Sequence, residues 1–227
     1  MRNLKFFNEN GYFIIDKVFS KEQCDELVHL ALELNNKDNL VPIMNIHNLS
    51  GKILDYMSND LIIDFINNFF QAKAYGLQTE YFFMPPGTKG FSAHQDNTYV
   101  QASSDSFISA WIALQDVTSF NGGLIIWPGT HKEKQLELVE NEVEPSKNQD
   151  PNARKMSSVI PKKYKAFSPK ISLGSVIFIH SWLVHASNNN ESNNNRNALL
   201  CTYIKEGADF RSGNYANREA FSLNGHK

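Results

Sequence analysis

The sequence of 227 residues has little of several features that mark particular classes of protein. Its only two cysteines, Cys24 and Cys201, are too few for the disulfide framework of a small secreted domain. With 22 basic and 24 acidic side chains the formal charge is −2, which excludes an overall polycation that binds nucleic acid through phosphates. No apolar run approaches the roughly 18 residues of a membrane span, and the N-terminus lacks the apolar core of a secretory signal. These absences predict a cytoplasmic protein that binds neither nucleic acid nor a membrane.

The pattern along the chain predicts one domain over residues 1–227, mainly β with supporting helices. A helical lead-in covers about 1–75, with a strand at 12–15, a helix that begins after the capping box at Ser20, and another over 60–70. A core at about 76–206 and a polar C-terminal tail at 207–227 complete the chain. The core holds short β-rich runs separated by turn signals, at 79–84, 107–114, 124–127, 175–179, 183–186 and 198–204. Two helices followed by many short strands indicate a sandwich or barrel with helical support.

A polar stretch at 132–170 interrupts the strands. Its first part, 133–144, is acidic and could be helical, and a run of basic residues follows. One interpretation is a solvated insertion between strands, and the other is a lid over a pocket. If it is a lid, the lysines around Lys162 and Lys163 would favour a substrate with a phosphate or carboxylate group.

Two histidines and a carboxylate form the first candidate site. If His94 and Asp96 lie on a strand, their side chains project from the same face, and His185 follows an apolar strand that would carry it inward. Two histidines and one carboxylate on a β scaffold occupy one face of an octahedral metal, as in non-haem Fe(II) oxygenases. Neither cysteine has a metal-like spacing to these residues, so structural zinc is disfavoured. Arg196, at the start of the next strand, could bind a carboxylate beside the metal.

Five motifs together resemble the phytanoyl-CoA dioxygenase family of Fe(II)- and 2-oxoglutarate-dependent oxygenases. The motifs are His94-x-Asp96, Ala110-Trp111-Ile112-Ala113-Leu114, Asn121-Gly122-Gly123-Leu124, Pro128-Gly129-Thr130-His131, and His185-Ala186-Ser187 with Arg196. The N-terminal Asn10-Gly11-Tyr12-Phe13-Ile14-Ile15 is also similar to that family's opening, so the resemblance runs from about residue 6 to 206. It implies a double-stranded β-helix (jelly roll, cupin-like) with N-terminal helices packed on one sheet.

The resemblance also implies roles for individual residues. His94, Asp96 and His185 would bind Fe(II), Arg196 would pair with the distal carboxylate of 2-oxoglutarate, and Ser187 would hydrogen-bond that carboxylate. The remaining candidates match positions that line the pocket: Trp111, Gln78 and Phe91 for the cosubstrate, and Asn97 and Tyr99, on the same strand as the metal motif, for the substrate. Because the motif retains Asp96, halogenation is disfavoured.

The implied reaction uses O₂ and 2-oxoglutarate to hydroxylate an unactivated C–H of a small metabolite or natural-product intermediate, with succinate and CO₂ as co-products. Two alternatives stay open: a jelly-roll binding protein without catalysis, and a cupin-like metalloenzyme that does not use 2-oxoglutarate. Arg196 and Ser187 argue against the second, because such a site has no need of a carboxylate clamp. His180 and His131 are interpreted as structural or loop residues, not as ligands.

Overall fold

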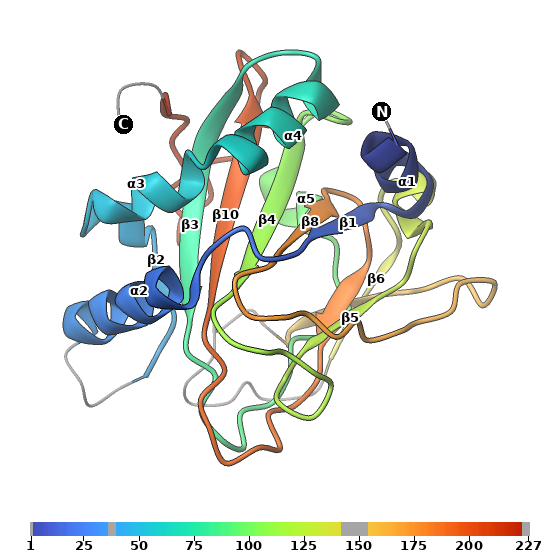
Figure 1. Ribbon diagram of the computed structural model, residues 1–227. Helices are drawn as coiled ribbons and strands as arrows, with labels where there is room; N and C mark the ends of the chain where they lie inside the picture. Colours follow the sequence, from blue (N-terminus) through green and yellow to red (C-terminus); the bar gives the residue numbers. More distant parts are fainter. Residues whose placement is uncertain (1, 36–39, 142–153, 224–227) are drawn as a thin grey trace.

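A computed structural model describes residues 2–35, 40–141 and 154–223 of the chain (Figure 1). Its strands are β1 (Tyr12–Ile15), β2 (Ile43–Met44), β3 (Ala74–Phe82), β4 (Phe107–Ala113), β5 (Leu124–Ile126), β6 (Leu138–Glu140), β7 (Met156–Ser158), β8 (Val176–His180), β9 (His185–Ser187) and β10 (Ala198–Lys205). Its helices are α1 (Arg2–Asn10), α2 (Lys21–Leu34), α3 (Lys52–Met57), α4 (Asp60–Phe70) and α5 (Asn97–Val100), with 3₁₀ turns η1 (Ile46–Asn48) and η2 (Thr130–Glu133). Within these ranges no helix is both long and apolar enough to cross a bilayer.

The main sheet has six antiparallel strands in the order β1-β8-β4-β10-β3-β2. Strands far apart in sequence are neighbours, so the N-terminal β1 and the late β8 pair along one edge. Two smaller sheets, β5-β9 and β6-β7, complete the β structure of the described residues. This arrangement is the jelly roll that the family resemblance implies. Strands β1, β4, β5, β8 and β10 lie within one residue of the predicted runs, but β3 begins five residues before its predicted run, and β2, β6 and β7 were not predicted.

Both faces of the main sheet are buried, and successive residues of β4 lie in different apolar clusters. Ala110 and Ile112 join the apolar cluster under the helices, whereas Trp111 and Ala113 point to the opposite face. A period of two is the expected consequence of strand geometry, in which successive side chains project to opposite sides. Phe178 on β8 packs on the helical side. The same sheet therefore supports a helical layer on one side and a cavity on the other.

Two helices of the helical layer, α2 and α4, form where the sequence predicts them, whereas α1 and α3 were not predicted (Figure 1). Ser20 caps α2 through a capping box with Gln23, in which each residue satisfies a backbone N–H of the other. Helix α4 begins and ends at the predicted residues and inserts Phe65 against Phe178, with ring centroids 4.1 Å apart and nearly parallel. The predicted packing of N-terminal helices on one sheet is confirmed.

Residues 94–99 do not form the predicted strand. His94 makes one isolated bridge to His185, and the chain then turns so that Asp96 precedes the short helix α5. The side chain of Gln95 holds this turn, because its amide donates to the carbonyls of Lys134 and Trp182 while its oxygen accepts from the Leu136 N–H. The buried amide thus diverts the chain from a second strand pairing.

The polar insertion differs from the helical interpretation, and the C-terminal tail has a defined place in the fold. The described part of the acidic stretch contains the end of η2 and the strand β6 in place of a helix, and its last residues, 142–144, lie outside the described residues. The tail is folded back on the sheet: Gly76 and Phe221 exchange both backbone hydrogen bonds at 2.9 Å, and Leu223 is buried. Because Gly76 has no side chain, the Phe221 ring can lie where a Cβ would be only 2.4 Å from it.

Candidate metal centre

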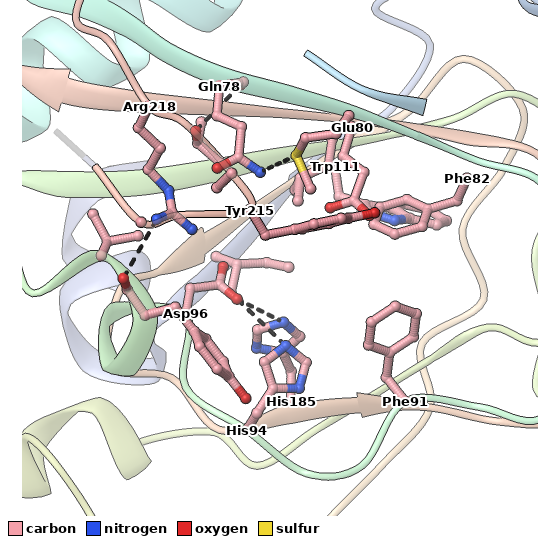
Figure 2. Close-up of a pocket in the computed structure, with 18 of the residues that line it drawn as sticks. Gln78, Glu80, Phe82, Phe91, His94, Asp96, Trp111, His185, Tyr215 and Arg218 are labelled. Carbon is pink, nitrogen blue, oxygen red and sulfur yellow. Dashed lines mark hydrogen bonds and ion pairs between the residues drawn. The ribbon is translucent and has the colours of Figure 1, made fainter. Parts of the chain in front are cut away.

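Three metal-ligand side chains meet on the cavity side of the main sheet (Figure 2). One ligand atom each from His94, Asp96 and His185 lies within 4.8 Å of the others. Among the described residues, these three form a group of side chains that could hold a metal ion. The histidines are brought together by their backbone bridge, with N···O distances of 2.9 and 3.0 Å. Asp96 reaches them from the N-terminal end of α5, so a turn and not a strand completes the triad.

Both imidazoles are oriented for metal binding. Nδ1 of His94 lies 2.8 Å from the carbonyl of Ser92, and Nδ1 of His185 lies 3.2 Å from the carbonyl of Leu183. A carbonyl can only accept, so each Nδ1 carries the proton and each Nε2 is left with a lone pair. The two Nε2 atoms both lie 3.4 Å from Oδ1 of Asp96. Backbone carbonyls thus fix the tautomer that a metal site requires.

The carboxylate of Asp96 is kept ionised. Burial alone would raise its pKa, but the neighbouring imidazoles of His185 and His94 and a hydrogen bond from Ser109 hold the pKa well below its usual range. That hydrogen bond joins Ser109 Oγ to Asp96 Oδ2 at 2.6 Å, which leaves Oδ1 directed at the histidines. Burial lowers the pKa of His185 to about 4, so its imidazole is neutral near pH 7. All three groups fit a divalent cation with open coordination positions.

Arg196 is the second part of the site. It is 4% exposed, and burial lowers its pKa to about 10, so it remains charged near neutral pH. Nη2 contacts Met84 Sδ at 2.7 Å and the guanidinium lies 5.4 Å from the centre of the Trp111 ring. Nε and Nη1 are buried without a hydrogen-bond partner among the described residues. A buried cation with unsatisfied donors costs free energy, and a carboxylate would satisfy it.

The other predicted cosubstrate residues line the same cavity, whose volume is about 400 Å³. Ser187 accepts a hydrogen bond from the Phe91 N–H at 2.8 Å, so its own hydroxyl proton can be donated to another group. Trp111 and Gln78 lie on the cavity face of the main sheet, and the amide of Gln78 contacts Met44 Sδ at 2.9 Å. The structure therefore brings together His94, Asp96, His185, Arg196, Ser187, Trp111, Gln78 and Phe91.

The structure places the two predicted substrate residues differently. Tyr99 lines the cavity. Asn97 does not line it, because α5 turns this side chain inward, where it is fully buried. Both polar atoms of its amide bond to the backbone of Ala102 at 2.9 Å, so Asn97 closes the end of α5 and is not a substrate contact.

Several cavity residues were missed by the sequence analysis. Ser109 does not itself line the cavity but bonds to Asp96, and its place on the same face as Trp111 follows from the alternation of β4. Glu80 similarly follows Gln78 by two residues on β3 and faces the cavity. Tyr215 and Arg218 come from the predicted tail and had no local signal (Figure 2).

The remaining histidines and lysines lie elsewhere. His180 contacts Asp105 Oδ1 through Nε2 at 3.0 Å, and its ring centroid lies 4.8 Å from that of His131; neither histidine lines the cavity. Lys162 and Lys163 do not line it either, and Lys163 pairs with Glu133 at 2.6 Å. The insertion nevertheless contributes Met156 to the cavity wall.

The fold and triad define a class: a jelly-roll protein with a site for a metal held by two histidines and one carboxylate on one face. The sequence matches the family described as phytanoyl-CoA dioxygenase (PhyH) over residues 7–198. The chain belongs to this family.

The chain is similar to part of the length of several named proteins. "Phytanoyl-CoA dioxygenase 1" of Oryza sativa subsp. japonica is 30% identical over 146 residues, which are 63% of this chain and 50% of the rice protein. The peroxisomal phytanoyl-CoA dioxygenase of Rattus norvegicus is 24% identical over 236 residues, covering 88% of this chain and 66% of the rat protein. The chain thus spans about half to two thirds of the length of these relatives.

Solved structures confirm the fold. The epimerase SnoN, in complex with Fe³⁺, alpha ketoglutarate and nogalamycin RO, has a TM-score of 0.76 at 15% identity, covering 92% of this chain and 85% of that one. EctD from S. alaskensis, with 2-oxoglutarate and 5-hydroxyectoine, has a TM-score of 0.68 at 19% identity, covering 90% and 75%.

Proposed function

We propose that the protein is an Fe(II)- and 2-oxoglutarate-dependent dioxygenase that hydroxylates an unactivated C–H of a small metabolite or natural-product intermediate. The observation that carries the proposal is Arg196: a buried guanidinium with unsatisfied Nε and Nη1, lining the same cavity as the His94, Asp96 and His185 triad. A metal triad alone fits many reactions, but a metal and a carboxylate-binding arginine in one cavity fit a keto acid that carries a second carboxylate.

In this proposal the triad binds Fe(II) through the two Nε2 atoms and the Asp96 carboxylate. Bound iron would supply the activation of O₂ that couples decarboxylation of 2-oxoglutarate, to succinate and CO₂, with insertion of one oxygen atom into a substrate C–H. The protein orients the reactants. Arg196 binds the distal carboxylate, Ser187 donates its hydroxyl proton to it, and Trp111 packs under the guanidinium.

The cavity volume supports a compact substrate. Its volume of about 400 Å³ is at the lower end of typical ligand pockets and must hold cosubstrate and substrate together. Tyr99 is placed to contact the substrate, since it lines the cavity from the helix that follows Asp96. The relatives' phytanoyl-CoA chemistry and the nogalamycin and ectoine compounds bound by structural neighbours show how widely this fold's ligands range.

The first test needs no substrate. The protein is mixed anaerobically with Fe(II) and 2-oxoglutarate, and the visible absorption spectrum is recorded. We expect the weak charge-transfer band of an iron-bound keto acid, and its loss in Asp96→Ala. We expect a large rise in the 2-oxoglutarate concentration needed for the band in Arg196→Gln, because that variant keeps the shape but loses the charge. Lys162→Gln, a loss of charge outside the cavity, is the control.

The two alternatives predict different spectra. A metalloenzyme that does not use 2-oxoglutarate binds Fe(II) without giving the band. A binding protein without catalysis binds no iron, or gives the band and releases no succinate with any substrate. Retention of succinate release in His94→Ala would contradict the ligand assignment itself.

A further inference from the structure

The C-terminal segment 211–218 forms a wall of the cavity that lies beyond the family match, which ends at residue 198. It is anchored on both sides of the cavity mouth. The Arg211 N–H donates to the Val100 carbonyl at the end of α5 at 2.6 Å, and Asn45 donates its side-chain amide to the Ala216 carbonyl at 2.7 Å. Phe221 then fastens the chain to β3. This wall is therefore part of the folded protein.

Arg218 is the half-buried cation of this wall (Figure 2). Its hydrogen bonds all use one nitrogen: Nη1 faces the carbonyls of Tyr99 at 3.4 Å, Arg211 at 3.3 Å and Ser212 at 3.3 Å. These bonds hold the guanidinium at the cavity. Within the described residues Nη2 and Nε make no hydrogen bond to the protein, so the three N–H groups of these two nitrogens remain for a ligand.

Charges of both signs surround Arg218. Burial lowers its pKa, Asp96 and Glu80 raise it, and Arg211 lowers it. Asp96 is engaged by the metal in the proposed function, and Arg196 by the distal carboxylate of the cosubstrate. Of the charged groups that line the cavity in the described structure, Arg211, Arg218 and Glu80 then face the space left for the substrate.

Opposite charges on two walls would orient a substrate. Glu80 lies on β3 and Arg218 on the C-terminal segment, and both line the cavity. An anionic group is repelled by a carboxylate and attracted by a guanidinium, which binds carboxylates and phosphates with two parallel hydrogen bonds. The anionic end of a ligand would therefore lie at Arg218.

We propose that Arg218 binds an anionic group, a carboxylate or a phosphate, of a compact substrate, and that segment 211–218 determines specificity. The proposal rests on the proposed function, since it concerns the substrate of that site. It replaces the lysine run of the insertion as the source of anion recognition, because Lys162 and Lys163 do not line the cavity.

The test compares anionic compounds with neutral ones of the same shape. The probes are N-acetyl-L-amino acids and 2-hydroxy acids, each paired with its primary amide, and phosphate monoesters, each paired with the parent alcohol. Binding to protein loaded anaerobically with Fe(II) and 2-oxoglutarate is followed by calorimetry and by the shift of the charge-transfer band. The proteins are the wild type, Arg218→Gln, Arg218→Lys, and Lys162→Gln as a control for loss of charge.

We expect at least one anionic compound to bind the wild type, with its neutral counterpart at least tenfold weaker. Arg218→Gln should bind the acid as weakly as the amide, Arg218→Lys should recover part of the difference, and Lys162→Gln should match the wild type. Preference for acids over phosphate esters, or the reverse, identifies which anion is bound.

Three results would overturn the proposal: no anionic compound binds the wild type, neutral compounds bind as tightly as their anionic partners, or Arg218→Gln retains the full preference. The acid–amide comparison in the wild type does not depend on any variant folding. Absence of the charge-transfer band in the wild type counts against the proposed function instead, and calorimetry with the same compounds then still decides the role of Arg218.

Discussion

The hydroxyl of Ser109 donates to Oδ2 of Asp96, while Oδ1 faces the Nε2 atoms of both histidines. A ligand carboxylate fixed in this way needs no reorganisation when a metal binds. The resemblance to the family implied the three ligands, but it carried no information about the group that orients Asp96. The alternation of β4 predicts which face Ser109 is on, but its contact with Asp96 depends on how the chain turns before α5.

We predict that Ser109→Ala weakens Fe(II) binding by about 10- to 100-fold, the usual effect of losing a group that orients a metal ligand. Competition with a chelator of known affinity measures this change. Ser106→Ala is the matched control, because Ser106 is equally buried and its hydroxyl bonds to the Ser103 carbonyl, away from the triad. Equal iron affinities in the two variants would show that Asp96 does not need Ser109.

His131 makes the stability of the protein depend on pH. Burial, with the neighbouring His180 and Lys132, lowers its pKa to about 4, and it is 8% exposed. Its unfolded pKa is about 6.5, so between these values the unfolded chain binds one more proton than the folded chain. Stability from this group is present above about pH 6.5 and is lost as the pH falls towards 4.

We therefore predict that the free energy of unfolding of the metal-free protein falls with acidification, His131 contributing up to about 3 kcal/mol between pH 6.5 and 4. Urea unfolding at several pH values measures the slope. His131→Asn should be less stable at pH 7 but show a shallower slope, whereas the exposed His29→Asn should keep the wild-type slope. An unchanged slope in His131→Asn would assign the effect to other groups.

At the scale of elements, the capping box of α2 is a local device that the sequence predicts and the structure confirms. The Ser20 hydroxyl accepts from the Gln23 N–H, and the Gln23 side chain accepts from the Ser20 N–H. We predict that Ser20→Ala lowers the free energy of unfolding by about 1 kcal/mol, because one N–H at the helix start loses its partner. Urea unfolding measures this, and iron affinity should be unchanged since α2 lies on the opposite side of the sheet from the triad. A loss of affinity would contradict this separation.

The attachment of the C-terminal segment depends on one close approach. A Cβ at Gly76 would lie 2.4 Å from the Phe221 ring, so Gly76→Ala must displace that ring, which also stacks on His47. We predict that trypsin cuts after Arg211 and Arg218 several-fold faster in Gly76→Ala, because the segment detaches from β3. Mass spectrometry of timed digests measures the rates.

Gly51→Ala is the matched control, because a Cβ there meets nothing within 4 Å. If Gly76→Ala is cleaved at the control's rate, the pairing with Phe221 does not hold the segment in place.

The elements show where sequence reasoning succeeds. Local patterns suffice for α2, α4 and most strands, because the capping box and the two apolar periods are encoded within a few residues. They fail for residues 94–99, where the side chain of Gln95 bonds to residues 134, 136 and 182. They fail again for the C-terminal segment, whose place depends on Gly76, Asn45 and Val100, each more than 100 residues away in the chain. Long-range polar contacts of this kind leave no periodic signal.

At the scale of the whole molecule, the cavity couples distant parts of the chain. The metal triad comes from the chain before α5 and from β9, and Arg196 from the residues before β10. A ligand that spans the metal and Arg196 would bind these parts only in their folded arrangement. Such a ligand stabilises the fold by mass action, by about 2.7 kcal/mol at 100 times its dissociation constant.

We predict that this stabilisation by 2-oxoglutarate requires the metal. Under anaerobic conditions 2-oxoglutarate should raise Tm clearly in the presence of Fe(II) and little in the presence of a chelator, because the keto acid end then has no ligand and only Arg196 binds the other end. Arg196→Gln should reduce the increase seen with Fe(II), and Lys162→Gln should not. An equal increase with and without metal would place 2-oxoglutarate outside the triad, and would leave the unsatisfied Nε and Nη1 of Arg196 to a different anion.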